Sequence, residues 1–262
     1  MVELHTLCES LCVDILLELF RYLYADEIFK NFNYVLHNLP LLLNRANLPL
    51  HVRYVDAYFR KHILPNINVD NVKSIRIPNM YHMAPVNLSQ FNCVQLLILH
   101  NVTELNWPKY FPNNVKYLII HVRSKHRHEV FRKALSLDHI QILEFHSTFL
   151  HFDDCDDKLT KPSPIKHLIF NSKQCFIHYQ FLINNMPNLL SLRSVNTHYP
   201  YRCKLNGNIF RNLRTINLTC KHIDIDEMID FLTHVAIGSL RRCRLINIEN
   251  SLSSGIAYVL IS

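Results

Sequence analysis

Short apolar patterns with a fixed internal spacing recur along residues 72–245 of the chain. In each pattern the first, fourth and sixth positions are predominantly apolar, so the last two alternate as in a strand with one buried face. The central positions of the eight patterns are Ile75, Leu97, Leu118, Leu143, Leu168, Leu192, Ile216 and Cys243. Successive centres lie 21 to 27 residues apart, which predicts a structural repeat with one strand per unit.

The segments between these strands must return the chain and cover the same core, because one strand cannot bury its apolar face alone. Several of them show helical periodicity. The apolar positions of the three expected helices are Val130, Phe131, Ala134 and Leu135, then Phe181, Leu182, Met186 and Leu189, then Ile225, Met228, Ile229 and Leu232. Strand and helix therefore alternate through most of the chain.

This pattern resembles diverged leucine-rich repeats. Five patterns keep the residue type that such repeats place after the strand, one position earlier than usual: Asn79, Asn101, Asn196, Cys220 and Asn247. The resemblance implies an α/β solenoid with parallel strands on its concave face and helices or irregular turns on its convex face. The competing interpretation is an α/β domain whose strands are evenly spaced.

The residues before the repeats have a helical character. Ile15, Leu16, Leu19, Phe20 and Leu23 share one face of a helix of about three turns, for which Ser10 is the expected cap. A second helix is predicted from the apolar cluster Ile28, Phe29, Phe32, Val35 and Leu36. We expect a break at Pro40 before Leu41–Leu43, and then a linking helix that ends at Pro65.

The N-terminal helices resemble the F-box, a helical module that docks onto the small adaptor subunit of cullin-based ubiquitin ligases. The matching segments are Leu11–Leu16, Leu19–Leu23, Glu27–Phe29 and Phe32–Asn33. Cys12 stands where the family usually has proline, and the third helix lacks the family's tryptophan, because Trp107 is the only one in the chain.

An F-box followed by leucine-rich repeats is the architecture of a family of substrate receptors in the ubiquitin conjugation pathway. The resemblance implies an F-box-like module at 1–50, a linking helix or cap at 51–70 and about eight repeats at 71–262. The partners that it implies are the ligase adaptor subunit, a cullin through that adaptor, and an unidentified protein substrate. It implies no enzymatic activity and no cofactor, and a cytoplasmic location, with the nucleus as an alternative. The alternative function is a leucine-rich-repeat protein-interaction scaffold that no longer docks the adaptor.

The resemblance assigns adaptor binding to the apolar positions of the module. These are Leu11, Cys12, Ile15, Leu16, Leu19, Phe20, Leu23, Ile28 and Phe32. Substrate binding is expected on the strand residues that alternate with the buried ones and therefore face outward. These are Ile98, His100, Ile119, His121, Glu144, His146, Ile169, Arg193 and Arg244.

His100, His121 and His146 occupy equivalent places in successive repeats, which raises a metal site as an alternative use. Neighbouring strands would hold the rings about 5 Å apart. Rings in a parallel ladder lie side by side and do not converge on one ion, so we expect no metal here. The acidic cluster Asp153–Asp157 lacks the glycine and glutamate of a calcium loop and is expected to be solvated.

Composition and charge narrow the remaining function classes. The chain has 262 residues and only three glycines, none of them grouped into a phosphate-binding loop, and no nucleophile-elbow motif is present. Its eight cysteines include no C-x-x-C pair, so buried, reduced thiols are expected. The apolar runs are too short for a membrane span.

Nucleic-acid binding is the third hypothesis, raised by the net charge of +7 and by basic stretches at Arg123–His128 and Arg241–Arg244. Both stretches lack interleaved aromatic residues, which disfavours it.

The apolar residues Ile256, Ala257, Val259, Leu260 and Ile261 end the chain without a polar capping repeat. Two interpretations follow: the sequence is part of a longer one, or these residues form a final edge strand.

Overall fold

The computed structural model divides the chain into two compact units. Unit 1 comprises Met1–His100 with Pro108–Val115, and unit 2 comprises Asn101–Trp107 with Lys116–Ser262. The structure describes residues 12–34, 36, 38–45, 48–53, 55–80, 88–103, 105–108, 110–123, 127–147, 150–151, 159–176, 179–198, 210–220, 239–247 and 256–259.

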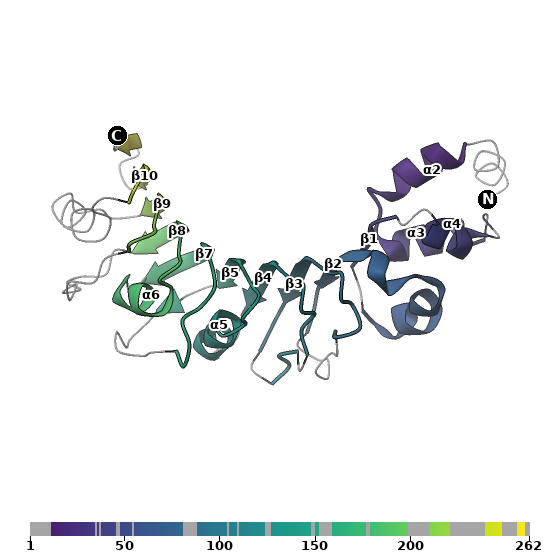
Figure 1. The fold of residues 1–262 in the computed structure, drawn as a ribbon, viewed down its shortest axis with the longest axis horizontal. Helices are drawn as coiled ribbons and strands as arrows, with labels where there is room; N and C mark the ends of the chain where they lie inside the picture. Colours follow the sequence, from purple (N-terminus) through teal and green to yellow (C-terminus); the bar gives the residue numbers. More distant parts are fainter. Residues whose placement is uncertain are drawn as a thin grey trace. The chain divides into compact units, whose positions relative to one another are not determined.

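The described part of unit 1 begins with three short helices, α2 (Val13–Phe20), α3 (Ala25–Phe32) and α4 (Leu39–Arg45) (Figure 1). Their apolar residues pack together, and the rings of Phe20 and Phe32 meet edge to face at 5.0 Å. The two predicted helices are therefore present. The expected cap was wrong, because Cys12 occupies the position before α2. The expected break at Pro40 was also wrong, because Pro40 lies in the first turn of α4, where a missing N–H is tolerated.

The rest of unit 1 joins these helices to the first strands. Its elements are β1 (Leu50–Val52), η1 (Phe59–Ile63), η2 (Leu64–Asn66), η3 (Val69–Asn71), β2 (Val72–Ile77) and β3 (Leu96–His100). The predicted linking helix corresponds to the π-helical η1 and the 3₁₀ turn η2, which contains Pro65. The sequence did not predict β1. This strand pairs in parallel with β2, which pairs in parallel with β3.

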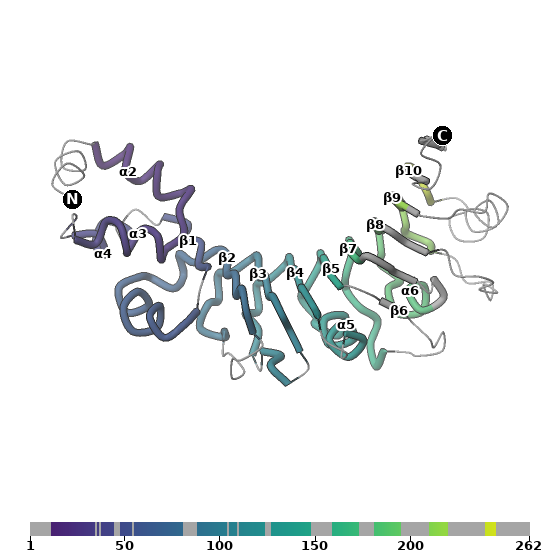
Figure 2. Tube along the Cα trace, turned by 180° about the vertical axis from the view of Figure 1, so that it is seen from behind, coloured from purple at the N-terminus to yellow at the C-terminus, as the bar shows by residue number. Residues whose placement is uncertain are grey.

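Unit 2 contains the remaining strands and, within the part of the chain that the structure describes, two helices. In chain order these are β4 (Tyr117–Val122), α5 (Arg127–Leu135), β5 (Ile142–Ser147), β6 (Leu150–His151), β7 (His167–Phe176), α6 (Tyr179–Asn185), β8 (Ser191–His198), β9 (Thr215–Cys220), β10 (Arg242–Asn247) and β11 (Ile256–Val259). From β4 to β10 the described strands pair in parallel, and β6 adds to β7. Both helices lie on the same side of these strands (Figures 1 and 2).

The strands repeat with a constant phase. In unit 2 the residue two places before each centre donates its backbone N–H to the equivalent carbonyl of the preceding strand, at 2.8–2.9 Å. The pairs are Gln141 with Lys116, Lys166 with Gln141, Leu190 with Lys166, Arg214 with Leu190 and Arg241 with Arg214. In unit 1, Gln95 bonds to Lys73 in the same way at 2.9 Å. All eight centres are buried, so the predicted strands and their inward-facing residues are confirmed.

The return segments supply the other layer of the core. Val130, Phe131, Ala134 and Leu135 of α5 are fully buried, which confirms the helix predicted there, and α6 confirms the second. The third predicted helix, at Ile225–Leu232, lies outside the described residues, as does the acidic cluster Asp153–Asp157. The chain is thus an α/β protein with open sheets of parallel strands.

Three further expectations have an outcome in the structure. Ile256–Val259 form the antiparallel strand β11 beside β10, as the edge-strand interpretation predicted. Cys243 is a buried free thiol, and burial raises its pKa to about 11, but Cys12 is exposed, so the expectation of buried thiols was wrong there. None of the helices that the structure describes has the length and apolar character of a membrane-spanning segment.

Candidate functional site

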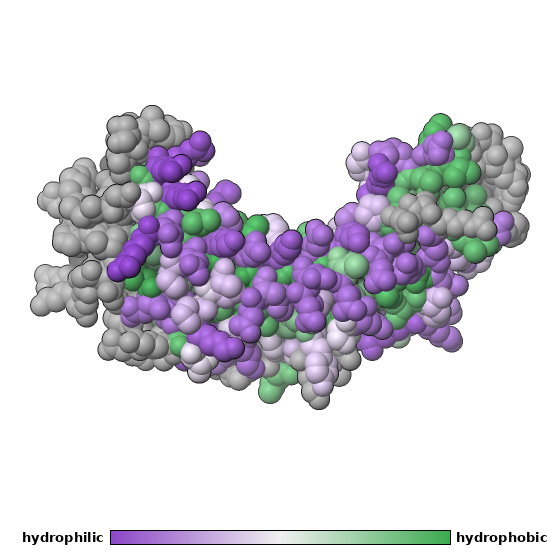
Figure 3. All heavy atoms as spheres, in the orientation of Figure 1, coloured by the Kyte–Doolittle hydropathy of each residue, from purple (hydrophilic) through white to green (hydrophobic). Residues whose placement is uncertain are grey.

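The helix α2 carries two parallel rows of apolar side chains. Leu16 and Phe20 form the inner row and are buried in unit 1. Ile15, Leu19 and Tyr22 form the outer row, with exposed fractions of 56%, 43% and 78%. The outer residues lie at i, i+4 and i+7, so they follow one stripe of the helix and its continuation. Figure 3 shows that apolar side chains gather over these N-terminal helices.

The two rows divide the residues that were assigned to adaptor binding. Leu16, Phe20, Ile28 and Phe32 are buried and hold the three helices together, and Leu23 is half-buried. Ile15 and Leu19 face outward and are available to a partner. Cys12 is exposed at the start of α2 with φ −60°, an angle that proline also adopts. Leu11 lies outside the described residues. The sequence placed the residues of this set from Ile15 to Leu23 on one helix face, and the structure separates those that pack from those that are exposed.

In unit 2 a chain of polar contacts crosses the outward face of β4 and β5. The Tyr117 hydroxyl donates to a Glu144 carboxylate oxygen at 2.7 Å, and Nε2 of His146 lies 2.7 Å from the other oxygen. The ring of His146 stacks on that of His121, with centroids 4.0 Å apart and 21° between the planes. The two rings thus lie side by side, as the parallel register of β4 and β5 requires.

Glu144 changes the acidity of Tyr117. Burial, the hydrogen bond to Glu144 and the charge of that carboxylate together raise the pKa of Tyr117 to about 12, against a smaller opposing effect of Arg193. The folded protein therefore binds this proton more tightly than the unfolded chain, whose tyrosine pKa is about 10. The resulting contribution to stability is complete below pH 10 and is lost as the pH rises from 10 through 12.

We expect the substitution Glu144→Gln to lower the Tyr117 pKa towards 10, because the amide carries no charge. The measurement is the alkaline titration of absorbance at 295 nm, which reports all twelve tyrosines. For the unaltered chain and for Glu144→Gln, the curve of the same protein with the added substitution Tyr117→Phe is subtracted, which leaves the titration of Tyr117. An unchanged midpoint in Glu144→Gln would show that the carboxylate does not control this phenol.

The other residues assigned to substrate binding also lie on outward faces. In unit 2, Ile119 and Ile169 are half-exposed, and Glu144 stands between them in register. Arg193 follows in the next strand, and Arg193 and Arg244 are exposed. In unit 1, Ile98 and His100 are half-exposed on β3. These three isoleucines are therefore not core residues, and their role in binding a substrate stays a prediction.

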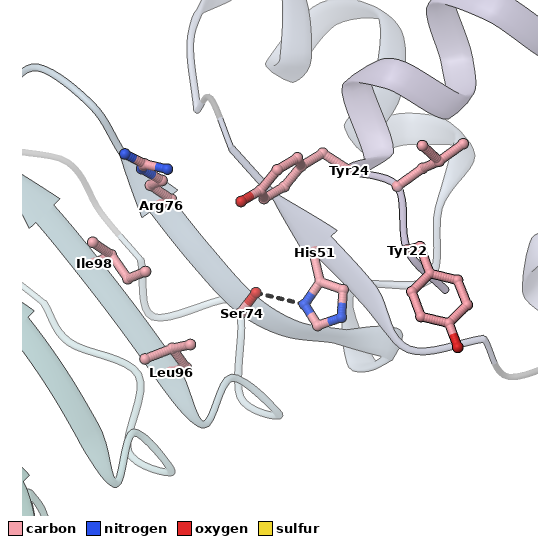
Figure 4. A pocket seen from close by; sticks show the side chains of 8 residues that line it. Tyr22, Tyr24, His51, Ser74, Arg76, Leu96 and Ile98 are labelled. Atoms are coloured by element: carbon pink, nitrogen blue, oxygen red, sulfur yellow. Dashed lines mark hydrogen bonds between the residues drawn. The ribbon is translucent and has the colours of Figure 1, made fainter. Parts of the chain in front are cut away.

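Unit 1 also contains a cavity of about 250 Å³. Its lining residues come from the segment between α2 and α3 and from β1, β2 and β3: Tyr22, Leu23, Tyr24, His51, Ser74, Arg76, Leu96 and Ile98 (Figure 4). His51, Ser74 and Leu96 are partners across the three parallel strands, and Arg76 and Ile98 form the next pair. Tyr24 joins this row through a single parallel bridge to His51.

Polar contacts hold several of these side chains in place. Nδ1 of His51 lies 2.7 Å from the Ser74 hydroxyl, and burial lowers the pKa of His51, which favours the neutral ring. Nε of Arg76 donates to Nε2 of His100 at 3.3 Å. Hydrogen bonds thus hold His51, Ser74 and Arg76, and the apolar side chains of Leu23, Leu96 and Ile98 also line the cavity.

Sequence reasoning missed the residues that precede each strand centre, among them Ser74 and Tyr117. The signal was present, because side chains one place before a centre share the outward face with those one and three places after it. It did not reveal the partners of these residues. Tyr24 and His51 had no such signal, since neither belongs to a repeated pattern.

Over the part of the chain that the structure describes, no group of three His, Cys, Asp or Glu side chains could hold a metal ion. The chain matches no protein-family model, no curated protein and no solved structure.

Proposed function

We propose that this chain is a non-enzymatic substrate receptor of a cullin-based ubiquitin ligase. Its N-terminal helices would dock the ligase adaptor subunit, and the outward faces of its strands would select the protein to be ubiquitinated. The proposal starts from the F-box-like residues of α2 and α3 and from their position before a strand repeat.

The observation that carries the proposal is the outer row of α2. Ile15, Leu19 and Tyr22 expose apolar surface although the helix already has a complete inner row for its own packing. A contiguous apolar patch of this kind commonly marks a site of protein interaction. Anchors at i, i+4 and i+7 are also the pattern by which a helix fits into a groove of a partner.

The side chains around this row agree with an interface. Asp14, Glu18 and Arg21 are exposed on α2 and its end, and Arg21 pairs with Glu18 at 2.9 Å. An apolar centre with a charged rim is typical of protein–protein interfaces. The strand faces offer a second surface with different chemistry, in which half-exposed isoleucines alternate with polar residues such as Glu144 and Arg193.

The substitution Leu19→Asp tests the docking surface. We expect it to weaken adaptor binding at least about 30-fold, because a carboxylate would enter an apolar contact where a central residue contributes strongly. Folding should change little, since Leu19 is 43% exposed and surface substitutions shift stability by about 0.5 kcal/mol or less. The measurements are a pull-down of the purified chain with the adaptor subunit and thermal melting.

Leu105→Asp is the matched control, because Leu105 is 87% exposed and belongs to unit 2. It should leave adaptor binding unchanged. If the unaltered chain does not bind the adaptor at micromolar concentration, the ligase role is wrong and the protein-interaction scaffold takes its place. If Leu19→Asp binds as well as the unaltered chain, docking does not use α2.

A further inference from the structure

The cavity of unit 1 has the chemistry of an anion site. Arg76 is the only arginine or lysine among its eight lining residues, and no aspartate or glutamate lines it. The neutral form of His51 leaves the Arg76 guanidinium as the fixed charge of the cavity. The hydroxyl of Tyr24 adds a donor beside it, and that of Ser74 adds another when Nδ1 of His51 carries the ring proton.

Arg53, in the same unit, differs from Arg76 because carboxylates neutralise its guanidinium. Arg53 lies 3.2 Å from Glu27 and 3.5 Å from Asp26, and it also covers the ring of Tyr24 at 5.0 Å. Arg76 has no such carboxylate among the described residues, and its one hydrogen bond there uses Nε. Its terminal nitrogens therefore keep the fork geometry that recognises a carboxylate or a phosphate.

The size of the cavity limits the occupant. About 250 Å³ is below the usual range of small-molecule sites, roughly 300–1,000 Å³, but it suits one side chain of a bound segment. The apolar surfaces of Leu23, Leu96 and Ile98 would cover the aliphatic part of that side chain. Figure 4 shows Leu96 and Ile98 on β3 beside Ser74 and Arg76 on β2, with Tyr24 on the other side of β2.

We propose that this cavity binds one anionic side chain of a protein segment, with Arg76 as its charge partner and Ser74 and Tyr24 as hydrogen-bond donors. The anion is a carboxylate or a phosphate ester, which share the geometry that a guanidinium recognises. That the segment belongs to a ubiquitination target rests on the proposed function, whereas the anionic chemistry rests on the cavity alone.

The test uses the full chain, immobilised, and three degenerate peptide pools that differ only in a central glutamate, glutamine or phosphoserine. We expect retention of the glutamate or phosphoserine pool to exceed that of the glutamine pool at least about tenfold. Of the two anionic pools, the one that is retained more strongly shows whether the bound group is a carboxylate or a phosphate ester. Equal retention of all three pools would overturn the proposal.

Three variants locate the effect. Arg76→Met should remove the preference, whereas Arg60→Met, at an exposed arginine of η1 outside the cavity, should keep it. Ile98→Trp should reduce retention of every pool by filling the cavity. A preference that survives both Arg76→Met and Ile98→Trp places the anion elsewhere and contradicts the proposal.

Adaptor binding by the same variants separates the two proposals. Arg76→Met should still bind the adaptor, because Arg76 lies on β2 and not on the outer row of α2. If the chain prefers anionic peptides but does not bind the adaptor, the ligase role fails and the cavity assignment stands. If it binds the adaptor and shows no preference for charge, only the cavity assignment fails.

Discussion

Phe131→Ala is expected to lower the free energy of unfolding of unit 2 by about 3–5 kcal/mol, the usual loss for a fully buried phenylalanine. Phe131 lies on α5 with no exposed surface. Its ring meets that of Phe145 edge to face at 5.0 Å and that of Phe170 at 5.5 Å. Alanine would leave a cavity between the helix and two strands, and both aromatic contacts would be lost.

The measurement is urea unfolding followed by the fluorescence of Trp107, the only tryptophan of the chain and part of unit 2. Leu105→Ala is the control, because it removes a large apolar side chain that is 87% exposed and should cost about 0.5 kcal/mol or less. A loss below about 1 kcal/mol for Phe131→Ala would mean that α5 does not cover the strands as described.

Arg53→Met is expected to destabilise unit 1 by about 2–3 kcal/mol. Asp26 on α3 is buried, and its Oδ1 has no hydrogen-bond partner among the described residues. Its Oδ2 lies 3.5 Å from Nη2 of Arg53. Removal of the cation leaves a buried carboxylate without its counter-charge, which costs about 3–5 kcal/mol for a fully buried pair. The side chain of Arg53 is 32% exposed, so solvent screening lowers that value here.

The double variant Asp26→Asn with Arg53→Met should recover about half of the loss or more, because the buried charge is then absent. The loss is measured as a shift of the unfolding transition in far-UV circular dichroism, since α2, α3 and α4 belong to unit 1. Full loss in the double variant would assign the effect to the packing of Arg53 on Tyr24.

Much of the fold could be predicted from local pattern. The spacing of the eight apolar patterns located the eight strands β2 to β5 and β7 to β10. Helical periodicity located α5 and α6. Both succeed because the side chains of a strand alternate with period 2, and those of a helix repeat at 3.6 residues, whatever lies next to them. The buried centres follow from the same periods.

Local pattern could not predict the features that depend on a neighbouring element. β1 is a strand of three residues that contains none of the repeated apolar patterns, and it forms because the edge of β2 is free to pair with it. The apolar face of α2 divides into a buried inner row, from which Phe20 packs against Phe32 of α3, and an exposed outer row. Neither the division of the α2 face into two rows nor the pairing of β1 with β2 produces a periodic pattern in the sequence.

The candidate sites show the same distinction. The sequence by itself determined which residues of each strand face outward, and it therefore indicated His121, Glu144 and His146. Only the tertiary structure decided that Tyr117 bonds to Glu144, and that Tyr24, His51 and Arg76 line one cavity although they are far apart along the chain. The physical reason is that alternation sets the direction of a side chain, whereas its partner is set by which strand lies beside it and in which register.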